Sequence, residues 1–367
     1  MLQWGRRKIC IIYKEAKMKK QFLVGALCLL LLLAVGCSEP ADTPAVETPD
    51  EEVSQTEDTA SKEATEDAMV EKVVMNIAAL KGPTGMGLSY LMEQDSLAAT
   101  ALDYNFDIVG APDQLIGKIV KGEVDVAAVP TNLAAVLDVK TEGKIQLLGI
   151  NTLGVLYVVE NGDSVQSIED LKGMEIGATG KGATPEYVLN YLLAQNELTE
   201  SVTIDYDLEH SELATKVASG ETKVALLPQP FVTSVMLANP DVRIAIDLNE
   251  AWTAGNDDLS SLPMGAIIVN KTYAQAHPEA IESFMKEYKT SVDYVNNKPV
   301  EAGKLIEKYA ILPKAALATK AIPNCSITLL SAQEAKADIL SFYEILKSFN
   351  PKSIGGKMPT DEFFYSN

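Results

Sequence analysis

Two glycine-rich stretches carry the residues of this chain that are best suited to binding a small solute. The first is Gly82-Pro-Thr-Gly-Met86 and the second is Thr179-Gly-Lys-Gly-Ala-Thr184. Each stretch follows an apolar run and precedes a segment with helical periodicity, so each is expected to open a helix. Free N–H groups and the positive dipole end of a helix favour an anionic or polar group there. The threonines would add hydroxyl donors, and the lysine would add a positive charge.

The alternative is that both stretches are ordinary turns. Glycine adopts backbone conformations that other residues avoid, and threonine commonly caps helices. A single loop of this kind does not distinguish a binding site from a turn. Two such loops at matching positions in the chain favour a site.

The matching positions come from a weak internal repeat. Lys118–Pro130 recurs 98 residues later as Lys216–Pro228, and Lys81 has an echo 100 residues later at Lys181. Each long block predicts a helix end, a Gly-Glu turn, a hydrophobic strand and a proline where that strand ends. The repeat therefore predicts two similar α/β lobes with a cleft between them, which is a common place for a ligand.

The order of the elements predicts how the lobes divide. Strands alternate with helices up to Pro278, and the chain is mainly helical afterwards, which is typical of mostly parallel sheets with helices on both faces. We expect one helix over 85–93, and a helix over 185–195 that Thr184 caps. Residues 72–154 plus 268–367 are predicted to form lobe 1, and 155–267 lobe 2. Two crossings, near 153–157 and 264–269, would suit a hinge.

The first 71 residues predict where the protein is located. Residues 22–35 form an uncharged, mostly apolar run after two lysines, which is typical of a signal peptide, and Met1 and Met18 are both possible starts. Ala34-Val-Gly-Cys37 resembles a bacterial lipobox, so residues 1–36 are read as a lipoprotein signal peptide and Cys37 as the lipidated residue. A plain secretory signal is the alternative. Residues 37–71 are acidic and lack aromatic residues, which predicts a disordered tether.

Charge and cysteine content exclude several kinds of site. The chain has 51 acidic and 31 basic residues, and a surface so acidic does not suit nucleic acid. Cys325 is the only cysteine in the body, so no intramolecular disulfide is possible there, and a buried hydrophobe is its default reading. No metal-ligand spacing and no phosphate loop occur, so neither metal nor cofactor is expected. His210 and His277 lie in polar, surface-like sequence, and no catalytic motif accompanies them.

Several segments of the chain resemble those of a known protein family. The residues that carry the resemblance are Leu80–Met86, Gly122–Pro130, Asp170–Gly173, Gly180–Pro185 and Leu227–Phe231. Together with the lipobox and tether, they resemble the ABC-transporter solute-binding lipoproteins for aliphatic sulfonates, nitrate, taurine and thiamine precursors. The resemblance implies a type II periplasmic binding fold with a small solute clamped between two lobes. It implies binding without catalysis, a permease with a cytoplasmic ATPase as partners, and a monomeric protein.

The same resemblance predicts where the protein is located and suggests alternative functions. The protein would be extracytoplasmic and lipid-anchored to the outer face of the cytoplasmic membrane. A ligand-sensing lipoprotein that acts with a receptor is one alternative. An enzyme related to thiamine-pyrimidine synthases is another, although a single body cysteine cannot supply their cysteine-rich iron motif. The sequence leaves the identity of the solute open.

Ligands of α/β sheets lie beyond the carboxyl ends of the strands. Met264 and Trp252 could line the apolar part of a ligand, although core packing is the simpler reading for both. The candidate ligand-binding residues are Gly82, Pro83, Thr84, Gly85, Met86, Pro130, Thr131, Asn132, Asn151, Thr152, Thr179, Gly180, Lys181, Gly182, Ala183, Thr184, Gln229 and Phe231.

Lipidation of Cys37 predicts how the protein divides between cell fractions. Cys37→Ala should release most of the protein from membranes, because two or more acyl chains anchor a protein where one chain is marginal. Fractionation of cells that make the wild type and the variant measures this. Equal membrane retention of both proteins would rule out a lipid anchor at Cys37.

Overall fold

The computed structural model describes residues 72–110, 112–181, 183–254 and 260–366. The expected signal peptide, the tether and Cys37 lie outside these residues. Within the described ranges, no helix combines the length and the apolar character that a membrane span needs.

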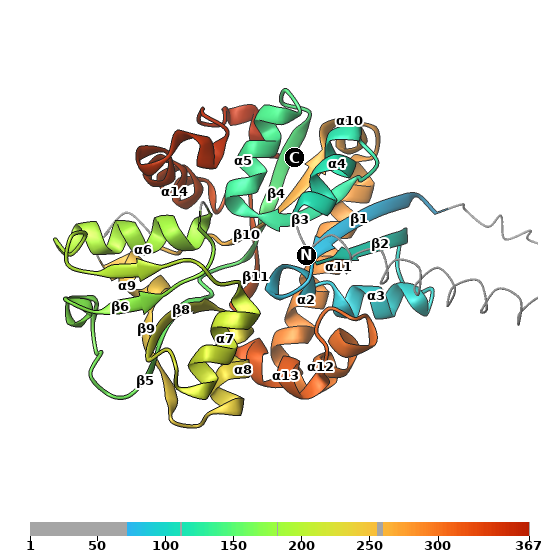
Figure 1. The fold of residues 1–367 in the computed structure, drawn as a ribbon. Coiled ribbons are helices and arrows are strands. Elements are labelled where there is room, and N and C mark those ends of the chain that lie inside the picture. The colour runs from blue at the N-terminus through green and yellow to red at the C-terminus, as the bar shows by residue number, and fades with distance from the viewer. Residues whose placement is uncertain (1–71, 111, 182, 255–259, 367) are drawn as a thin grey trace, which may run out of the picture. The chain divides into compact units, whose positions relative to one another are not determined.

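The strands form two sheets (Figure 1). The six-stranded sheet has the order β11-β4-β10-β3-β1-β2, and its strands are β1 (Val74–Leu80), β2 (Asp103–Val109), β3 (Val126–Pro130), β4 (Ile145–Thr152), β10 (Gly265–Asn270) and β11 (Ile327–Ser331). The five-stranded sheet has the order β7-β6-β8-β5-β9, and its strands are β5 (Leu156–Asn161), β6 (Glu175–Gly177), β7 (Thr203–Asp205), β8 (Val224–Pro228) and β9 (Val242–Asp247).

The two sheets have matching strand orders. β1 pairs in parallel with β2 and β3, as β6 does with β7 and β8. Each sheet contains an inner strand that is antiparallel to both of its neighbours and that has an equivalent in the other sheet: β10 lies between β3 and β4, and β5 lies between β8 and β9. The edge strand β11, which is antiparallel to β4, has no equivalent in the five-stranded sheet. The expected two-lobed α/β architecture is confirmed, with sheets that are mixed because each contains a reversed strand.

These reversed strands are where the chain crosses between the lobes. β4 leads directly into β5, and β10 returns to the first sheet after β9. All of β10 pairs within the six-stranded sheet, so the return crossing ends before Gly265. The lobe boundary expected at 267 therefore falls inside a strand of lobe 1.

Helices cover both faces of each sheet (Figure 1). The α-helices are α2 (Pro83–Met86), α3 (Ser89–Ser96), α4 (Pro112–Lys121), α5 (Thr131–Lys140), α6 (Thr184–Gln195), α7 (His210–Ser219), α8 (Phe231–Ala238), α9 (Leu248–Ala254), α10 (Lys271–Ala276), α11 (Pro278–Asn297), α12 (Pro299–Lys308), α13 (Ala315–Ala321) and α14 (Lys336–Phe349). Short 3₁₀ turns are η1 (Ile168–Leu171), η2 (Ile322–Asn324), η3 (Pro351–Ile354) and η4 (Asp361–Phe363). Alternate residues of β1 enter different hydrophobic clusters, which explains its continuous apolar sequence from Ile77 to Leu80.

The single helix expected over 85–93 is wrong, because two helices share this stretch. In a continuous helix, the N–H of Leu91 would donate to the carbonyl of Gly87. Instead, the N–H of Leu91 donates to Ser291 Oγ over 3.0 Å, and Ser291 Oγ donates to the Gly87 carbonyl over 2.6 Å. A side chain inserted into the helical ladder breaks it at that point. The strand β11 was not expected either.

The sequence repeat corresponds to equivalent structural elements. β3 and β8 both end at the prolines of the repeat, Pro130 and Pro228. Gly122 and Gly220, 98 residues apart, follow α4 and α7 with φ angles of 73° and 82°. Glycine adopts this left-handed conformation without the penalty that a Cβ imposes, so it recurs at both helix ends.

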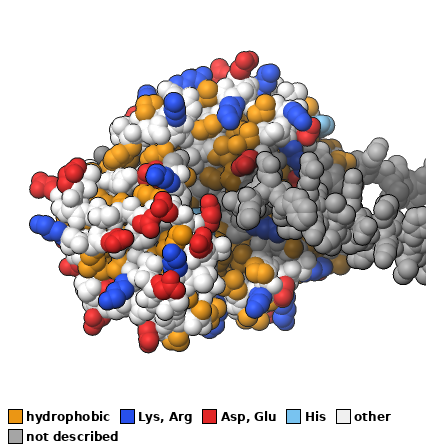
Figure 2. Space-filling view, viewed as in Figure 1, with side chains coloured by type: hydrophobic (Ala, Val, Ile, Leu, Met, Phe, Trp, Pro, Cys, Tyr) orange, Lys and Arg blue, Asp and Glu red, His pale blue; other side chains and the backbone are white. Residues whose placement is uncertain are grey.

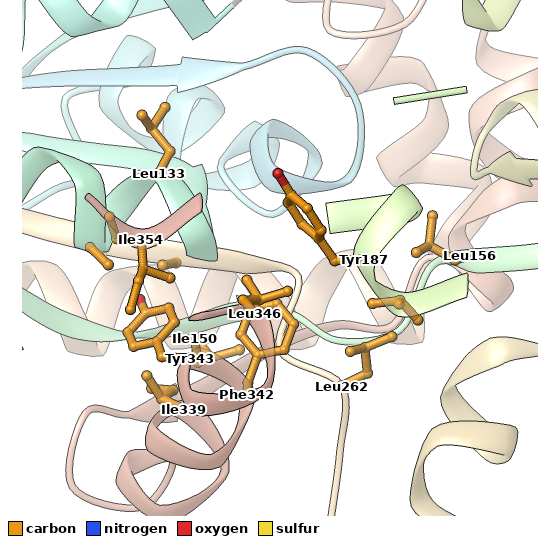
Figure 3. Close-up of a cluster of buried hydrophobic side chains, with 14 of the residues drawn as sticks. Leu133, Ile150, Leu156, Tyr187, Leu262, Ile339, Phe342, Tyr343, Leu346 and Ile354 are labelled. Carbon is orange, nitrogen blue, oxygen red and sulfur yellow. The ribbon is translucent and has the colours of Figure 1, made fainter. Parts of the chain in front are cut away.

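The helix α14 joins the hydrophobic cores of the two lobes. Its residues Phe342, Tyr343 and Leu346 are fully buried in one cluster that includes Leu133 of lobe 1 and Tyr187 of lobe 2 (Figure 3). The ring of Phe342 lies 5.9 Å from that of Trp252, which is also fully buried. Lobe 2 therefore packs against the C-terminal part of the chain as well as against its own helices.

A buried carboxylate fixes the turn after β5. Glu160, 3% exposed, accepts hydrogen bonds from Ser164 N and Oγ and from Val165 N, and it pairs with Arg243 at 2.7 Å. Burial opposes the ionisation of Glu160, but these hydrogen bonds and the positive charge outweigh it and hold its pKa below the usual value. The carboxylate therefore stabilises the fold only while it is ionised.

Glu160→Gln should lower the free energy of unfolding by about 1–3 kcal/mol at pH 7, because a charge-assisted network becomes neutral. Because the folded pKa is depressed, wild type loses this stabilisation as the pH falls below the ordinary Glu pKa of about 4.3. In urea unfolding experiments, the difference in free energy of unfolding between wild type and Glu160→Gln should become smaller as the pH falls from 7 to 3. Glu344→Gln, at an exposed carboxylate of α14, is the control. A difference for Glu160→Gln that stays constant with pH would contradict the prediction.

Candidate functional site

The candidate residues lie in the loops that follow the carboxyl ends of the strands. The stretch 82–86 follows β1, 130–132 follows β3, and 151–154 ends β4, while 178–184 follows β6 and 228–231 follows β8. Two of these loops are tied to the crossings by equivalent backbone hydrogen bonds. The N–H of Thr131 donates to the Met264 carbonyl at 3.1 Å, and the N–H of Gln229 donates to the Val155 carbonyl at 2.9 Å. Both loops therefore lie where the lobes join.

A side-chain hydrogen bond connects candidate residues of the two lobes. Thr184 Oγ1 donates to Asn132 Oδ1 over 3.2 Å, which brings the first turn of α6 against the first turn of α5. Asn132 Nδ2 also donates to the Ser353 carbonyl over 3.4 Å. The expected cap role of Thr184 is wrong, because Thr184 is already the first residue of α6 and its N-cap, Ala183, makes no side-chain cap bond. The hydroxyl is instead used between the lobes.

A buried amide holds the loop after β1. Asn151 is fully buried, and its Nδ2 donates to the Thr84 carbonyl at 3.0 Å and to Tyr288 Oη at 3.2 Å. Its Oδ1 accepts from Thr152 Oγ1 at 3.3 Å. A Cβ added to Gly265 would lie 2.5 Å from Asn151 Oδ1, so this strand needs a glycine beside the amide. Asn151 and Thr152 thus have partners within the protein and position the loop.

The loop 82–86 forms a single short helical turn rather than the start of a longer helix. α2 is one turn long, and the hydroxyl of Thr84 donates to the Leu80 carbonyl over a long 3.4 Å. A Cβ on Gly85 would lie 2.4 Å from the same carbonyl oxygen, which explains the glycine. Met86 is fully buried in the core cluster beneath this loop, so packing accounts for it.

In lobe 2, sequence reasoning missed His210. Its Nδ1 lies 2.5 Å from the Oγ1 of the buried Thr179, and its ring centroid is 5.2 Å from that of Phe231. The surface-like setting expected for His210 is wrong, because the side chain is largely covered, and this burial lowers its pKa. A histidine at the start of α7 gives no local signal that it meets a threonine 31 residues earlier.

The remaining candidates occupy different environments. Lys181 is exposed, Gly180 has a φ of 80°, and Gly182 lies outside the described residues. Met264 is half-buried, whereas Trp252 packs in the core between Tyr191 and Phe342. Cys325 is buried as expected, and burial raises the pKa of its thiol to about 12.

The strand-end loops hold polar groups but little negative charge. None of the loops 82–86, 130–132, 151–154, 178–184 and 228–231 contains an acidic residue, although the chain has 51. Asp247, at the end of β9, uses its Oδ1 to accept from the N–H groups of Asn249 and Glu250. Elsewhere on the face in Figure 2, acidic and basic side chains are interspersed. Among the described residues, no three His, Cys, Asp or Glu side chains could share a metal ion.

Comparisons with known proteins agree with the two-lobed fold. Residues 143–302 match the family model described as NMT1/THI5 like. An ABC transporter protein from Parabacteroides distasonis is 25% identical, with a TM-score of 0.70 over 80% of this chain and 99% of that one. The periplasmic aliphatic sulphonate binding protein SsuA from Escherichia coli is 17% identical, with a TM-score of 0.61 over 80% and 92%.

A nitrate-binding protein completes the comparison. The periplasmic protein NrtA from Synechocystis PCC 6803 is 10% identical, with a TM-score of 0.51 over 72% of this chain and 74% of that one. No curated protein sequence matches the chain. The described part of the chain therefore has the two-lobed fold of periplasmic solute-binding proteins of ABC transporters, and it is similar to the NMT1/THI5-like family over 143–302.

Proposed function

We propose that this protein captures a small polar or anionic organic solute between its lobes and delivers it to an ABC importer. The observation that carries the proposal is the junction of the lobes, where polar loops free of acidic residues meet through the Thr184–Asn132 hydrogen bond. Two crossings join the lobes there, and such an arrangement allows hinge closure around a solute.

The chemistry of these loops supports a polar or anionic solute. The N-terminal turns of α5 and α6 meet at the junction, and helix N-termini favour negative charge. The structural neighbours include proteins that bind aliphatic sulphonate and nitrate. We propose binding without catalysis, with no cofactor.

The setting of the protein is part of the same proposal. The lipobox-like sequence at Cys37 and the acidic residues of 37–71 support a lipid anchor on the outer face of the cytoplasmic membrane, and we propose that the protein is a monomer. Its partners would be the permease and ATPase of the importer. The extracytoplasmic location agrees with that of the periplasmic structural neighbours.

Solute binding should stabilise the protein. Thermal melts of the full chain in detergent with MOPS, taurine, nitrate or the thiamine pyrimidine precursor should show a higher melting temperature with at least one. A solute at one hundred times its Kd contributes about 2.7 kcal/mol. Mass spectrometry should recover that solute unchanged, since we propose no catalysis. The absence of stabilisation by all four, or chemical conversion of the bound solute, would contradict the proposal.

The bond between the lobes should be measurable in the protein without solute. Thr184→Ala and Asn132→Ala should each lower the free energy of unfolding by about 0.5–1.5 kcal/mol, because each removes the partly buried Thr184–Asn132 hydrogen bond. Asn132→Ala also removes the long bond to the Ser353 carbonyl. The double variant should cost less than the sum, because both changes remove the same bond. Urea unfolding of the four proteins gives this coupling, and Thr84→Ala, whose hydroxyl bond is long, is the control. Strict additivity would show that the bond does not form in solution.

A further inference from the structure

Two buried polar groups at the lobe junction have no hydrogen-bond partner within the described residues. They are Thr131 Oγ1 and Gln229 Nε2, in side chains that are 1% and 3% exposed. Each residue follows the proline that ends its strand, and the two positions are 98 residues apart in the repeat. Buried donors are normally paired, so two orphans at equivalent positions require an explanation.

The orientation of the Gln229 amide is fixed by its neighbour. Gln229 Oε1 accepts from Thr233 N at 3.3 Å and from Thr233 Oγ1 at 2.7 Å. A backbone N–H can only donate, so the atom that faces it must be the oxygen, and the amide cannot be flipped. Gln229 therefore presents its NH₂ group, which only donates, on its other side.

Thr131 is held equally firmly by its backbone. Its N–H donates to the Met264 carbonyl, and its carbonyl accepts from Tyr343 Oη at 2.7 Å. With both backbone groups paired, the hydroxyl is the one polar group of this residue that lacks a partner. The neighbouring Asn132 contacts Thr184 of the other lobe, so this hydroxyl is beside the junction.

The absence of acidic residues in these loops indicates which groups could be hydrogen-bond partners of Thr131 and Gln229. The loops that contain Thr131 and Gln229 carry no acidic residue that could accept from them. Oxygen or ring-nitrogen acceptors of a bound solute would supply the missing partners. Solutes whose polar atoms only donate, such as simple ammonium ions, could donate to the Thr131 hydroxyl but would leave the Gln229 NH₂ group unpaired and bind poorly.

We propose that Gln229 and Thr131 are a pair of specificity-determining donors, one from each lobe, that hydrogen-bond to acceptor atoms of the solute. This inference rests on the proposed function, since it assumes a solute at the lobe junction. Because the donors belong to different lobes, a solute that pairs with both also joins the lobes.

Calorimetry on the full chain in detergent, with MOPS, taurine, nitrate and the thiamine pyrimidine precursor as probes, tests the pair. Gln229→Glu keeps the acceptor for Thr233 and removes the donor, and Thr131→Val removes the hydroxyl at nearly constant shape. For a probe that the wild type binds, each variant should have a Kd about five- to a hundredfold higher than that of the wild type. Affinity of Gln229→Glu should recover as the pH falls, because a protonated carboxyl donates again.

Ser89→Ala is the matched control, because Ser89 Oγ is also buried without a partner but lies in α3, outside these loops. It should leave the Kd unchanged. Without solute, Ser89→Ala and Thr131→Val should melt at or above the wild-type temperature, since neither removes a hydrogen bond. A lower melting temperature for Thr131→Val would show a structural partner and overturn the inference.

The results also separate this inference from the proposed function. If wild type binds a probe and both Thr131→Val and Gln229→Glu bind it equally well, the donor pair is refuted while solute binding stands. If wild type binds none of the four probes, the proposed function fails and the inference fails with it.

Discussion

The exchange of a central strand between the two lobes is the constraint on which the rest of this structure depends. β10 lies inside the six-stranded sheet but enters from lobe 2, and β5 lies inside the five-stranded sheet but enters from lobe 1. Neither sheet is continuous without a strand that the other lobe delivers. The crossings before these strands also accept the N–H groups of Thr131 and Gln229. The strand exchange that completes the sheets therefore also positions the candidate loops.

The pseudo-symmetry of the lobes extends to the backbone but not to the side chains at the junction. In lobe 1 the polar side chains of the loops are mostly satisfied within the protein, as Asn151 and Thr152 show. In lobe 2, Thr179 meets His210, a residue with no counterpart in the described loops of lobe 1. A repeated backbone supplies equivalent donor positions, and diverged side chains can then distinguish one end of a solute from the other.

The C-terminal part of the chain controls how the two lobes contact each other. α14 fills the space between them with aromatic side chains, and Asn350 Nδ2 donates to Tyr187 Oη in α6. A second contact joins the lobes where Tyr157 Oη of β5 donates to the Asn324 carbonyl in η2. Motion about the crossings must therefore preserve or exchange these contacts. Such packed interfaces have discrete arrangements, which favours switching between defined states over continuous bending.

The sequence by itself determined the repeat, the strand–helix order and the strand-end prolines, because these depend on local backbone preferences and on short-range hydrophobic patterns. It also placed the polar residues in loops, since carboxyl-end loops follow from strand order. Only the tertiary structure decided which loops meet. Ser291 divides the 83–96 stretch, His210 faces Thr179, and Asn132 bonds Thr184, each through a contact between residues far apart in the chain. Such contacts depend on packing between distant elements, which leaves no mark in local sequence.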